Sequence, residues 1–539
     1  MKRLVIWGGA AVAAIVVLTI VAAVALPRLV DTPRVQSLIA TQASQALGRP
    51  VSFSSVSASL FPLPSVILKD LKVAEDPRFG TSPFLALDRG ELRLKLGALA
   101  SGRIEFGGLV LKKPVIAIVQ DGQGRWNFST LGASTEPRAP SSKPRGGGVA
   151  TAAAPLTGDV KLENGVVTFQ TRGSARAAQS YRIENLDLAV DASGGRLAFK
   201  GAARVKPGDL QLKITDGTVT LNGGRSLMDA PIAAKIAIDG RQVKDLVGAT
   251  LGPEPAIAGG LNGALTLSGT AASPRAAGDV TLSDVAITRT SAHCPDPKQR
   301  TLKLDTVKLK VGWEDGHLVA RPVTTAIAKG PIATNLVATL ESGTHVQLRD
   351  LRIRTLPIEK VLVDYLCQGY AVTGPLDLNG VLSFDARDLW GTLAGSGELK
   401  IGGGRVVGSQ ALALLGGVTR VGGAVSSLLA PDAPAIAPGS PLEFDAITAT
   451  YTIAKGVVTT RDLLYASRAL RMTVAGDYTL TSGRMNLDVV ATQGRNEIHA
   501  KVAGTAAAPQ IRVNPAATLR SVDPERARSG LEDLLRRFR

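Results

Sequence analysis

The stretch Leu92-Arg93-Leu94-Lys95-Leu96 alternates apolar and charged residues, and this period of two recurs along most of the chain. Because successive side chains of a β-strand point to opposite faces, such a segment predicts a strand with one apolar and one polar face. Further segments with the same alternation are Leu186, Leu188 and Val190; Leu210, Leu212 and Ile214; Leu265 and Leu267; Leu302 and Leu304; and Met472 and Val474. The chain is therefore predicted to be mainly β.

Short Asx-Gly pairs punctuate these segments, and each is a typical hairpin-turn signal because Asn, Asp and Gly tolerate positive φ. The pairs are Asp121-Gly122, Asn164-Gly165, Asp216-Gly217, Asn262-Gly263 and Asn379-Gly380. Together with the alternation they predict a long antiparallel sheet whose strands follow one another along the chain. The predicted fold is thus an elongated antiparallel β-sheet with a few short helices.

One apolar segment, residues 4–26, carries no charge and is long enough to span a bilayer as a helix. We interpret residues 1–27 as a transmembrane anchor. The alternative is a cleaved signal peptide, with Lys2 and Arg3 as its basic region and Ala23-Val24-Ala25 before the cleavage point. Both interpretations place the rest of the chain outside the cytoplasm.

The remaining sequence divides by composition into four further parts. Residues 28–131 begin with an amphipathic helix that ends at Gly48 and continue as a β module. Residues 132–155 are rich in Pro, Gly, Ser and Ala and predict a flexible linker. Residues 156–515 form the long β segment, interrupted near residues 410–429 by an apolar, glycine-rich helix. Residues 516–539 predict a basic amphipathic helix that could close a groove, bind a partner, lie on a membrane or pack on the last strands.

The chain is strongly basic, with a formal net charge of +17, but only 4% of its residues are aromatic. Single-stranded nucleic acid is normally held on aromatic platforms, so this composition disfavours a nucleic-acid partner. The positive charge then suits either anionic lipid head groups or an ordinary solvated surface.

No constellation of residues predicts catalysis, and we expect neither an enzyme, a cofactor nor a metal site. The four histidines are dispersed along the chain, and no zinc-protease, nucleophile-elbow or P-loop motif occurs. The two cysteines, Cys294 and Cys367, fit no metal-binding spacing; they could form a disulfide or remain as free buried thiols.

The chain resembles the AsmA family of Gram-negative envelope proteins. The C-terminal resemblance rests on Leu442-Glu443-Phe444-Asp445-Ala446-Ile447-Thr448-Ala449-Thr450-Tyr451, on residues 456–463 and 476–480, and on Val502-Ala503-Gly504-Thr505 with Pro509. The N-terminal resemblance rests on Leu47-Gly48-Arg49-Pro50-Val51 and Gly124-Arg125-Trp126-Asn127-Phe128. The region from about residue 400 to 515 is accordingly expected to be AsmA-like.

This resemblance implies an inner-membrane anchor and a periplasmic β-sheet that curls into a groove lined with apolar side chains. Such grooves are thought to carry phospholipids for outer-membrane assembly or maintenance, with an envelope partner at the C-terminal end. The candidate lining residues are Leu186, Leu188, Val190, Leu210, Leu212, Ile214, Leu265, Leu267, Leu302, Leu304, Met472 and Val474. The alternative is a periplasmic scaffold or outer-membrane protein assembly factor with a closed β core, because alternation alone describes any β-sandwich as well.

Overall fold

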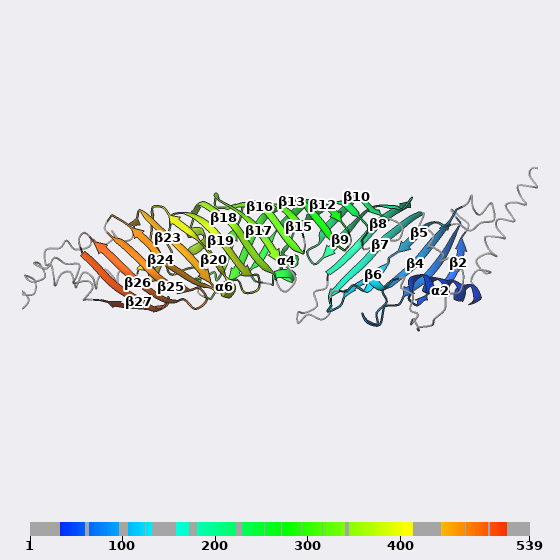
Figure 1. Cartoon of the computed structure of the whole chain (residues 1–539), viewed down its shortest axis with the longest axis horizontal. Coiled ribbons are helices and arrows are strands. Elements are labelled where there is room, and N and C mark those ends of the chain that lie inside the picture. Colours follow the sequence, from blue (N-terminus) through cyan, green and yellow to red (C-terminus); the bar gives the residue numbers. More distant parts are fainter. Residues whose placement is uncertain are drawn as a thin grey trace, which may run out of the picture. The chain divides into compact units, whose positions relative to one another are not determined.

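The computed structural model is mainly β and divides into two compact units (Figure 1). Unit 1 comprises residues 1–240 and 264–274, and unit 2 comprises residues 241–263 and 275–539. The structure describes residues 33–514 except 60–63, 96–105, 124, 132–157, 172–180, 222–228, 253, 271, 293, 315, 340–343, 413–442, 469 and 494–495. The predicted anchor, the linker at 132–155, most of the helix at 410–429 and the C-terminal helix lie outside the described residues.

Unit 1 opens with the helix predicted before Gly48, which is α2 (Pro33–Leu47). Its strands are β1 (Val51–Ser52), β2 (Ser55–Ser59), β3 (Ser65–Val73), β4 (Leu85–Leu94), β5 (Phe106–Lys112), β6 (Val115–Gln120), β7 (Gly158–Thr171), β8 (Tyr181–Ser193), β9 (Arg196–Lys206), β10 (Leu210–Thr220) and β11 (Ile232–Gly240), with a short 3-10 helix η1 (Asn127–Thr130) after β6. From β7 to β11 each strand pairs antiparallel with the next, as predicted.

One pairing in unit 1 departs from the predicted antiparallel order. Both β5 and β6 pair in parallel with β7, which follows them in the chain after residues 132–157. Leu111 of β5 is aligned with Leu162 of β7, and Ile116 of β6 is aligned with Val167. The β module before the predicted linker and the strands after it therefore share one sheet.

The described residues of unit 2 form one long series of strands with three short helices. Its elements are α4 (Lys244–Leu251), β13 (Pro274–Thr290), β14 (Gln299–Lys303), β15 (Val307–Glu314), β16 (His317–Ile327), β17 (Gly330–Thr339), β18 (His345–Pro357), α5 (Glu359–Leu362), β19 (Pro375–Asp385), α6 (Leu389–Thr392), β20 (Ala394–Ile401), β21 (Gly404–Arg405), β22 (Glu443–Phe444), β23 (Ala446–Ala454), β24 (Val457–Ala466), β25 (Arg471–Thr479), β26 (Arg484–Gln493), β27 (Asn496–Thr505) and β28 (Ala508–Val513), and β12 (Ala256–Gly269) is divided between the units. Strands β15 to β20 and β23 to β28 pair antiparallel in chain order, with β20 beside β23.

Four of the five predicted hairpin turns are wrong. Asn164-Gly165, Asp216-Gly217, Asn262-Gly263 and Asn379-Gly380 lie inside β7, β10, β12 and β19, and only Asp121-Gly122 lies in a turn, after β6. Asn164 and Asp216 have φ near +52°, and the pairing register shifts beside each of them. The left-handed conformation that suits a hairpin turn here produces a β-bulge within a strand.

These bulges decide which side chains share a face. In β8, Asn185 has φ of 51° and the register with β9 shifts between Glu184 and Asp187. Ile183 consequently faces Val205 and Leu188 faces Gly201, two positions on the same face of β9, although the two β8 residues differ by an odd number. The bulge therefore keeps apolar residues on both sides of Asn185 on one face.

We expect Asn185→Val to destabilise unit 1 by about 1–2 kcal/mol, because a β-branched residue is strongly disfavoured in the left-handed conformation. Chemical denaturation monitored by circular dichroism measures the change. The matched control is Asp191→Val, an exposed residue of the same strand outside the bulge, which should not lower stability. Equal stability of the two variants would show that the bulge does not require Asn185.

A buried polar network holds the N-terminal end of unit 1 together. The guanidinium of Arg49 donates from Nη1 to Glu75 Oε1 at 2.9 Å and from Nη2 to the carbonyl oxygen of Asn127 at 2.5 Å. Asn127 Nδ2 donates to Glu75 Oε2 at 2.6 Å, and all three residues are at most 9% exposed. The network joins the two N-terminal motifs that carry the AsmA resemblance, because Arg49 belongs to the first and Asn127 to the second.

A disulfide joins Cys294, in the loop between β13 and β14, to Cys367, in the loop after α5. It closes a sequence separation of 73 residues, and Cys294 is almost fully buried. Constraining so long a loop in the unfolded chain stabilises the folded state. We expect Cys294→Ser with Cys367→Ser to lower the unfolding free energy of unit 2 by about 2–4 kcal/mol. Denaturation of the full chain with and without reductant checks this value, since the double variant should no longer respond to reductant.

Candidate functional site: an open apolar face in unit 1

Two rows of apolar side chains run across the strands of unit 1 on one face of the sheet. The Leu188 row aligns Leu68, Gly90, Leu111, Leu162, Leu188, Gly201, Ile214 and Ile236 through successive register pairs from β3 to β11. The Val190 row aligns Val66, Leu92, Leu109, Val160, Val190 and Phe199 from β3 to β9. The two rows define the apolar face of unit 1.

All twelve side chains of these rows, glycines aside, are half-buried. Side chains in the closed core of a β-sandwich are mostly removed from solvent, whereas residues on a solvated face are mostly polar. Leucine, valine and isoleucine that stay only half-buried side by side over several strands form a continuous apolar surface that is partly accessible to solvent. Such a surface is the usual mark of a binding site for an apolar partner.

Neighbouring side chains of the rows are packed closely along the sheet, although each is only half-buried. A β-carbon added to Gly201 would lie 3.1 Å from Leu188 Cδ1, so the leucine side chain leans across its glycine neighbour. The ring of Phe199 similarly lies against Gly217 of β10. Gly201 and Gly217 thus leave room for the neighbouring large apolar side chains to lie across them on the sheet.

Over β7–β11, the opposite face of the sheet is charged. Lys161, Lys200, Lys213 and Lys235 are exposed on β7, β9, β10 and β11, and Lys235 Nζ pairs with Asp216 at 2.9 Å. Lys200 lies directly beside Ala189, the outward-facing neighbour of Leu188. Over β7–β11, unit 1 therefore presents an apolar face and a charged, solvated face from one layer of strands.

The structure brings the predicted lining residues together in part. Leu186, Leu188 and Val190 of β8 lie on the apolar face with Leu212 and Ile214 of β10, all half-buried, whereas Leu210 is buried. In β12, Leu265 and Leu267 are half-buried as well. The other four candidates lie in unit 2, where Leu302, Leu304, Met472 and Val474 pack against clusters of buried side chains.

Sequence reasoning missed nine of the twelve side chains that make up the face. Leu111, Leu162 and Ile236 occupy the Leu188 row without having been singled out, although Leu162 alternates with polar residues as the predicted positions do. The alignment of Leu111 with Leu162 depends on the parallel pairing of β5 with β7, for which the sequence carries no local signal.

Among the described residues of unit 2, several tyrosines have shifted pKa values. Burial, with a smaller effect from Asp445, raises the pKa of Tyr465 to about 12, and burial also raises the pKa of Tyr451 and Tyr478. These phenols stay neutral at every physiological pH. Among the described residues no group of His, Cys, Asp and Glu side chains is arranged to hold a metal ion.

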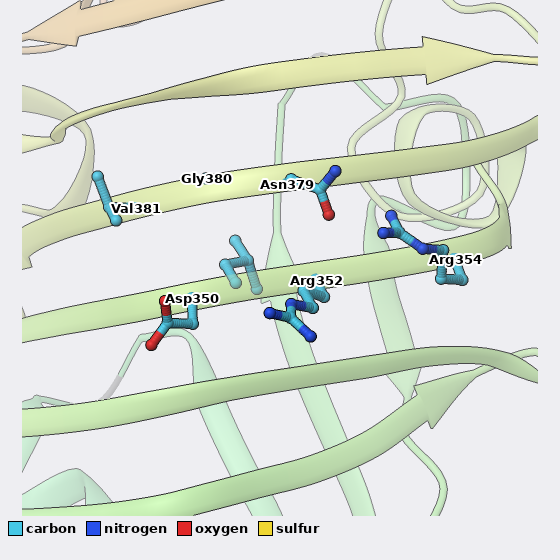
Figure 2. A pocket seen from close by; sticks show the side chains of 7 residues that line it. Asp350, Arg352, Arg354, Asn379, Gly380 and Val381 are labelled. Atoms are coloured by element: carbon cyan, nitrogen blue, oxygen red, sulfur yellow. The ribbon is translucent and has the colours of Figure 1, made fainter.

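A depression of about 480 Å³ lies over β18 and β19. Figure 2 shows Asp350, Arg352 and Arg354 along β18 beside Asn379 and Val381 on β19. Two of its polar side chains already have partners, since Asn335 Nδ2 donates to Asp350 and Asn379 Nδ2 donates to Glu398. The depression therefore resembles an ordinary charged sheet surface more than a site for a small molecule.

The comparison with protein families bears on unit 1. Residues 1–225 match the model of the AsmA family. The predicted AsmA resemblance is thereby confirmed over that range, which includes the Arg49–Glu75–Asn127 network and the Leu188 row as far as Ile214. The C-terminal motifs on which the resemblance also rested lie beyond the matched residues. No curated protein and no solved structure matches the chain.

The AsmA match and the large β-sheet both fit a lipid-related role in the cell envelope. No helix among the described residues is long and apolar enough to cross a membrane, and the predicted span at residues 4–26 lies outside them.

Proposed function

We propose that this protein is an inner-membrane-anchored periplasmic protein that carries or shelters phospholipids for outer-membrane assembly or maintenance. The observation that carries the proposal is the apolar face of unit 1, whose twelve aligned side chains are only half-buried from β3 to β11. Acyl chains cover such a surface with dispersion contacts and need no oriented polar partners.

The mechanism is passive. Acyl chains lie along the Leu188 and Val190 rows while the head groups stay in water. Because neighbouring positions of a row offer the same contacts, a chain can move along it without a large barrier. In this mechanism the apolar rows contribute surface and not chemistry, and the proposed role is that of a carrier.

Residues 4–26 would hold the protein in the inner membrane and leave the rest of the chain in the periplasm. The Cys294–Cys367 disulfide supports this location, because disulfides persist in the oxidising periplasm and are rare in the cytosol. A protein of the outer membrane or envelope is the proposed partner at the C-terminal end.

The second candidate is a non-transporting scaffold or outer-membrane protein assembly factor. Its support is in unit 2, where the apolar face is closed by the chain itself: Leu356, Ile401 and Ala491 are 2%, 6% and 1% exposed. A closed face of this kind serves stability and not lipid binding. The two candidates therefore differ in what covers the apolar face of unit 1.

Site-specific photo-cross-linking distinguishes them. A photoreactive phenylalanine analogue is placed at Leu188 of the full chain and, as the matched control, at Lys200 on the opposite face. After irradiation in membranes, mass spectrometry of the purified protein detects attached phospholipid. The proposal predicts lipid adducts at Leu188 and few at Lys200. Protein adducts alone at Leu188, in a folded variant, would favour the scaffold.

A further inference from the structure

Two segments of unit 2 leave the sheet and pair with each other. Residues 358–374 connect β18 to β19 and contain α5, and residues 404–412 follow β20. Val372 and Val406 form an antiparallel bridge, Thr373 N donates to Arg405 O at 2.8 Å, and Gln410 N donates to Gly369 O at 2.9 Å. We call this pair of segments the crosspiece.

The crosspiece packs on an apolar row of unit 2. Successive register pairs from β18 to β27 align Leu356, Leu376, Ile401, Ile447, Tyr465, Met472, Ala491 and Ile498. These side chains form one cluster with Ile358, Val361, Leu362, Val372, Val406, Ala411 and Leu412 of the crosspiece. All members of the row except Met472 are buried, in contrast to the half-exposed rows of unit 1.

Tyr370 connects the crosspiece to the opposite rim of the strands. The crosspiece leaves the sheet at the rim formed by the end of β18 and the start of β19, whereas the turn between β27 and β28 lies at the opposite rim. Tyr370 Oη donates to the carbonyl oxygen of Ala506 in that turn at 3.1 Å. Its ring packs with Met472, Val474 and Leu487 around the buried Met485, Val489 and Val502.

The Cys294–Cys367 disulfide ties the crosspiece to the sheet. Cys367 lies between α5 and Tyr370, and Cys294 lies in the loop after β13. Nearby, the guanidinium of Arg289 on β13 lies 5.8 Å from the ring centroid of Tyr365, the residue two before Cys367. The crosspiece is therefore fixed at three places: the disulfide, the bridge between Val372 and Val406, and the hydrogen bond from Tyr370.

We infer that the crosspiece is a stop for lipid. It takes the place of acyl chains on the apolar face from β18 to β28, so that bound phospholipid is excluded from these strands, β24–β28 included, while the disulfide and Tyr370 hold the crosspiece in position. This inference rests on the proposed function, because a stop has meaning only where lipid is bound. Access to the last strands then requires the crosspiece to move.

The test maps where lipid contacts the full chain. The protein is reconstituted in vesicles of phosphatidylethanolamine and phosphatidylglycerol that contain a phosphatidylcholine with a diazirine in one acyl chain. After irradiation and proteolysis, mass spectrometry assigns adducts to peptides of β7–β11 and of β24–β28. The variants are Cys294→Ser with Cys367→Ser, and Tyr370→Phe, which removes one hydroxyl and leaves the ring packing intact. Asp477→Asn, at an exposed residue of β25, is the matched control.

We expect adducts on β7–β11 and almost none on β24–β28 in the unaltered protein. Tyr370→Phe should raise adducts on β24–β28 about fivefold, the factor expected for the loss of one hydrogen bond, and the double serine variant should raise them further. Asp477→Asn should leave the pattern unchanged.

Three results would overturn the stop. If the unaltered protein carried adducts on β24–β28 as often as on β7–β11, the crosspiece would not be a stop. Lipid binding itself would still be supported. A pattern that no variant changes, in folded protein, would show that the crosspiece does not exclude lipid. The absence of adducts from both sets of strands would instead reject the proposed function, and the stop with it.

Discussion

Leu188→Glu is expected to weaken phospholipid binding by at least about tenfold while the protein remains folded. Leu188 lies near the middle of its row, so an acyl chain on the apolar face would have to cover the new carboxylate and remove it from water, which costs more than the 1.4 kcal/mol that corresponds to a factor of ten. Without lipid, the same carboxylate can reach solvent because the site is half-exposed. A titration with a phospholipid carrying a fluorescent acyl chain measures the change in affinity.

Lys200→Glu provides the matched control, since it reverses a charge on the opposite face of the sheet. Lys200 is paired with Ala189, the residue that follows Leu188. The substitution should leave acyl-chain binding unchanged within about twofold, because the site of contact is unaltered. A thermal melt accompanies both variants. If Leu188→Glu unfolded the protein, as a charge placed in a closed core does, the apolar face of unit 1 would be a core and not a binding surface.

Glu75→Gln is expected to lower the free energy of unfolding of unit 1 by about 3–5 kcal/mol, because it removes the carboxylate charge that pairs with the buried Arg49 guanidinium. Glu75 accepts from both Arg49 and Asn127, and the guanidinium also donates to the Asn127 carbonyl oxygen. Asn127 in turn accepts at Oδ1 from the backbone of Val119 at 3.0 Å. Removing one charge therefore affects the segments that follow α2 and β3, together with β6 and η1. Denaturant unfolding of the full chain measures the loss.

The control for this network is Asp88→Asn, which breaks the exposed ion pair between Asp88 and Lys113 in the same unit. Exposed pairs contribute little to stability, so the midpoint should hardly move. If Glu75→Gln were as mild as Asp88→Asn, the buried network would not hold the N-terminal end of the unit. The restoration of stability by Arg49→Met in the Glu75→Gln background would support the account, because it removes the unpaired charge.

Alternation predicted the strands well because the period of two is a local property of a sheet with unlike faces. Leu186, Leu188, Leu212 and Ile214 lie on one face, as their spacing indicates. The turn predictions failed for an equally local reason. An Asx residue at positive φ is compatible with a hairpin turn and with a bulge inside a strand, and the residues around Asn164 and Asp216 do not separate the two.

Features that depend on contacts between distant segments could not be predicted from the sequence. Parallel pairing of β5 with β7 joins segments separated by residues 132–157, and no residue of either strand specifies its partner. The bond between Cys294 and Cys367 joins two loops whose approach depends on the whole of unit 2. The crosspiece lacks any periodicity, so its burial against the row from Leu356 to Ile498 follows from the tertiary structure alone.

The central claim is that the apolar face of unit 1 is covered by phospholipid acyl chains. Mass spectrometry of the lipids retained by residues 28–539, purified without detergent, tests it most directly. The account predicts phospholipid in roughly stoichiometric amount with the unaltered protein and with Lys200→Glu, and its loss from Leu188→Glu. A folded protein that retains no lipid would contradict the account and leave the scaffold as the function of the sheet.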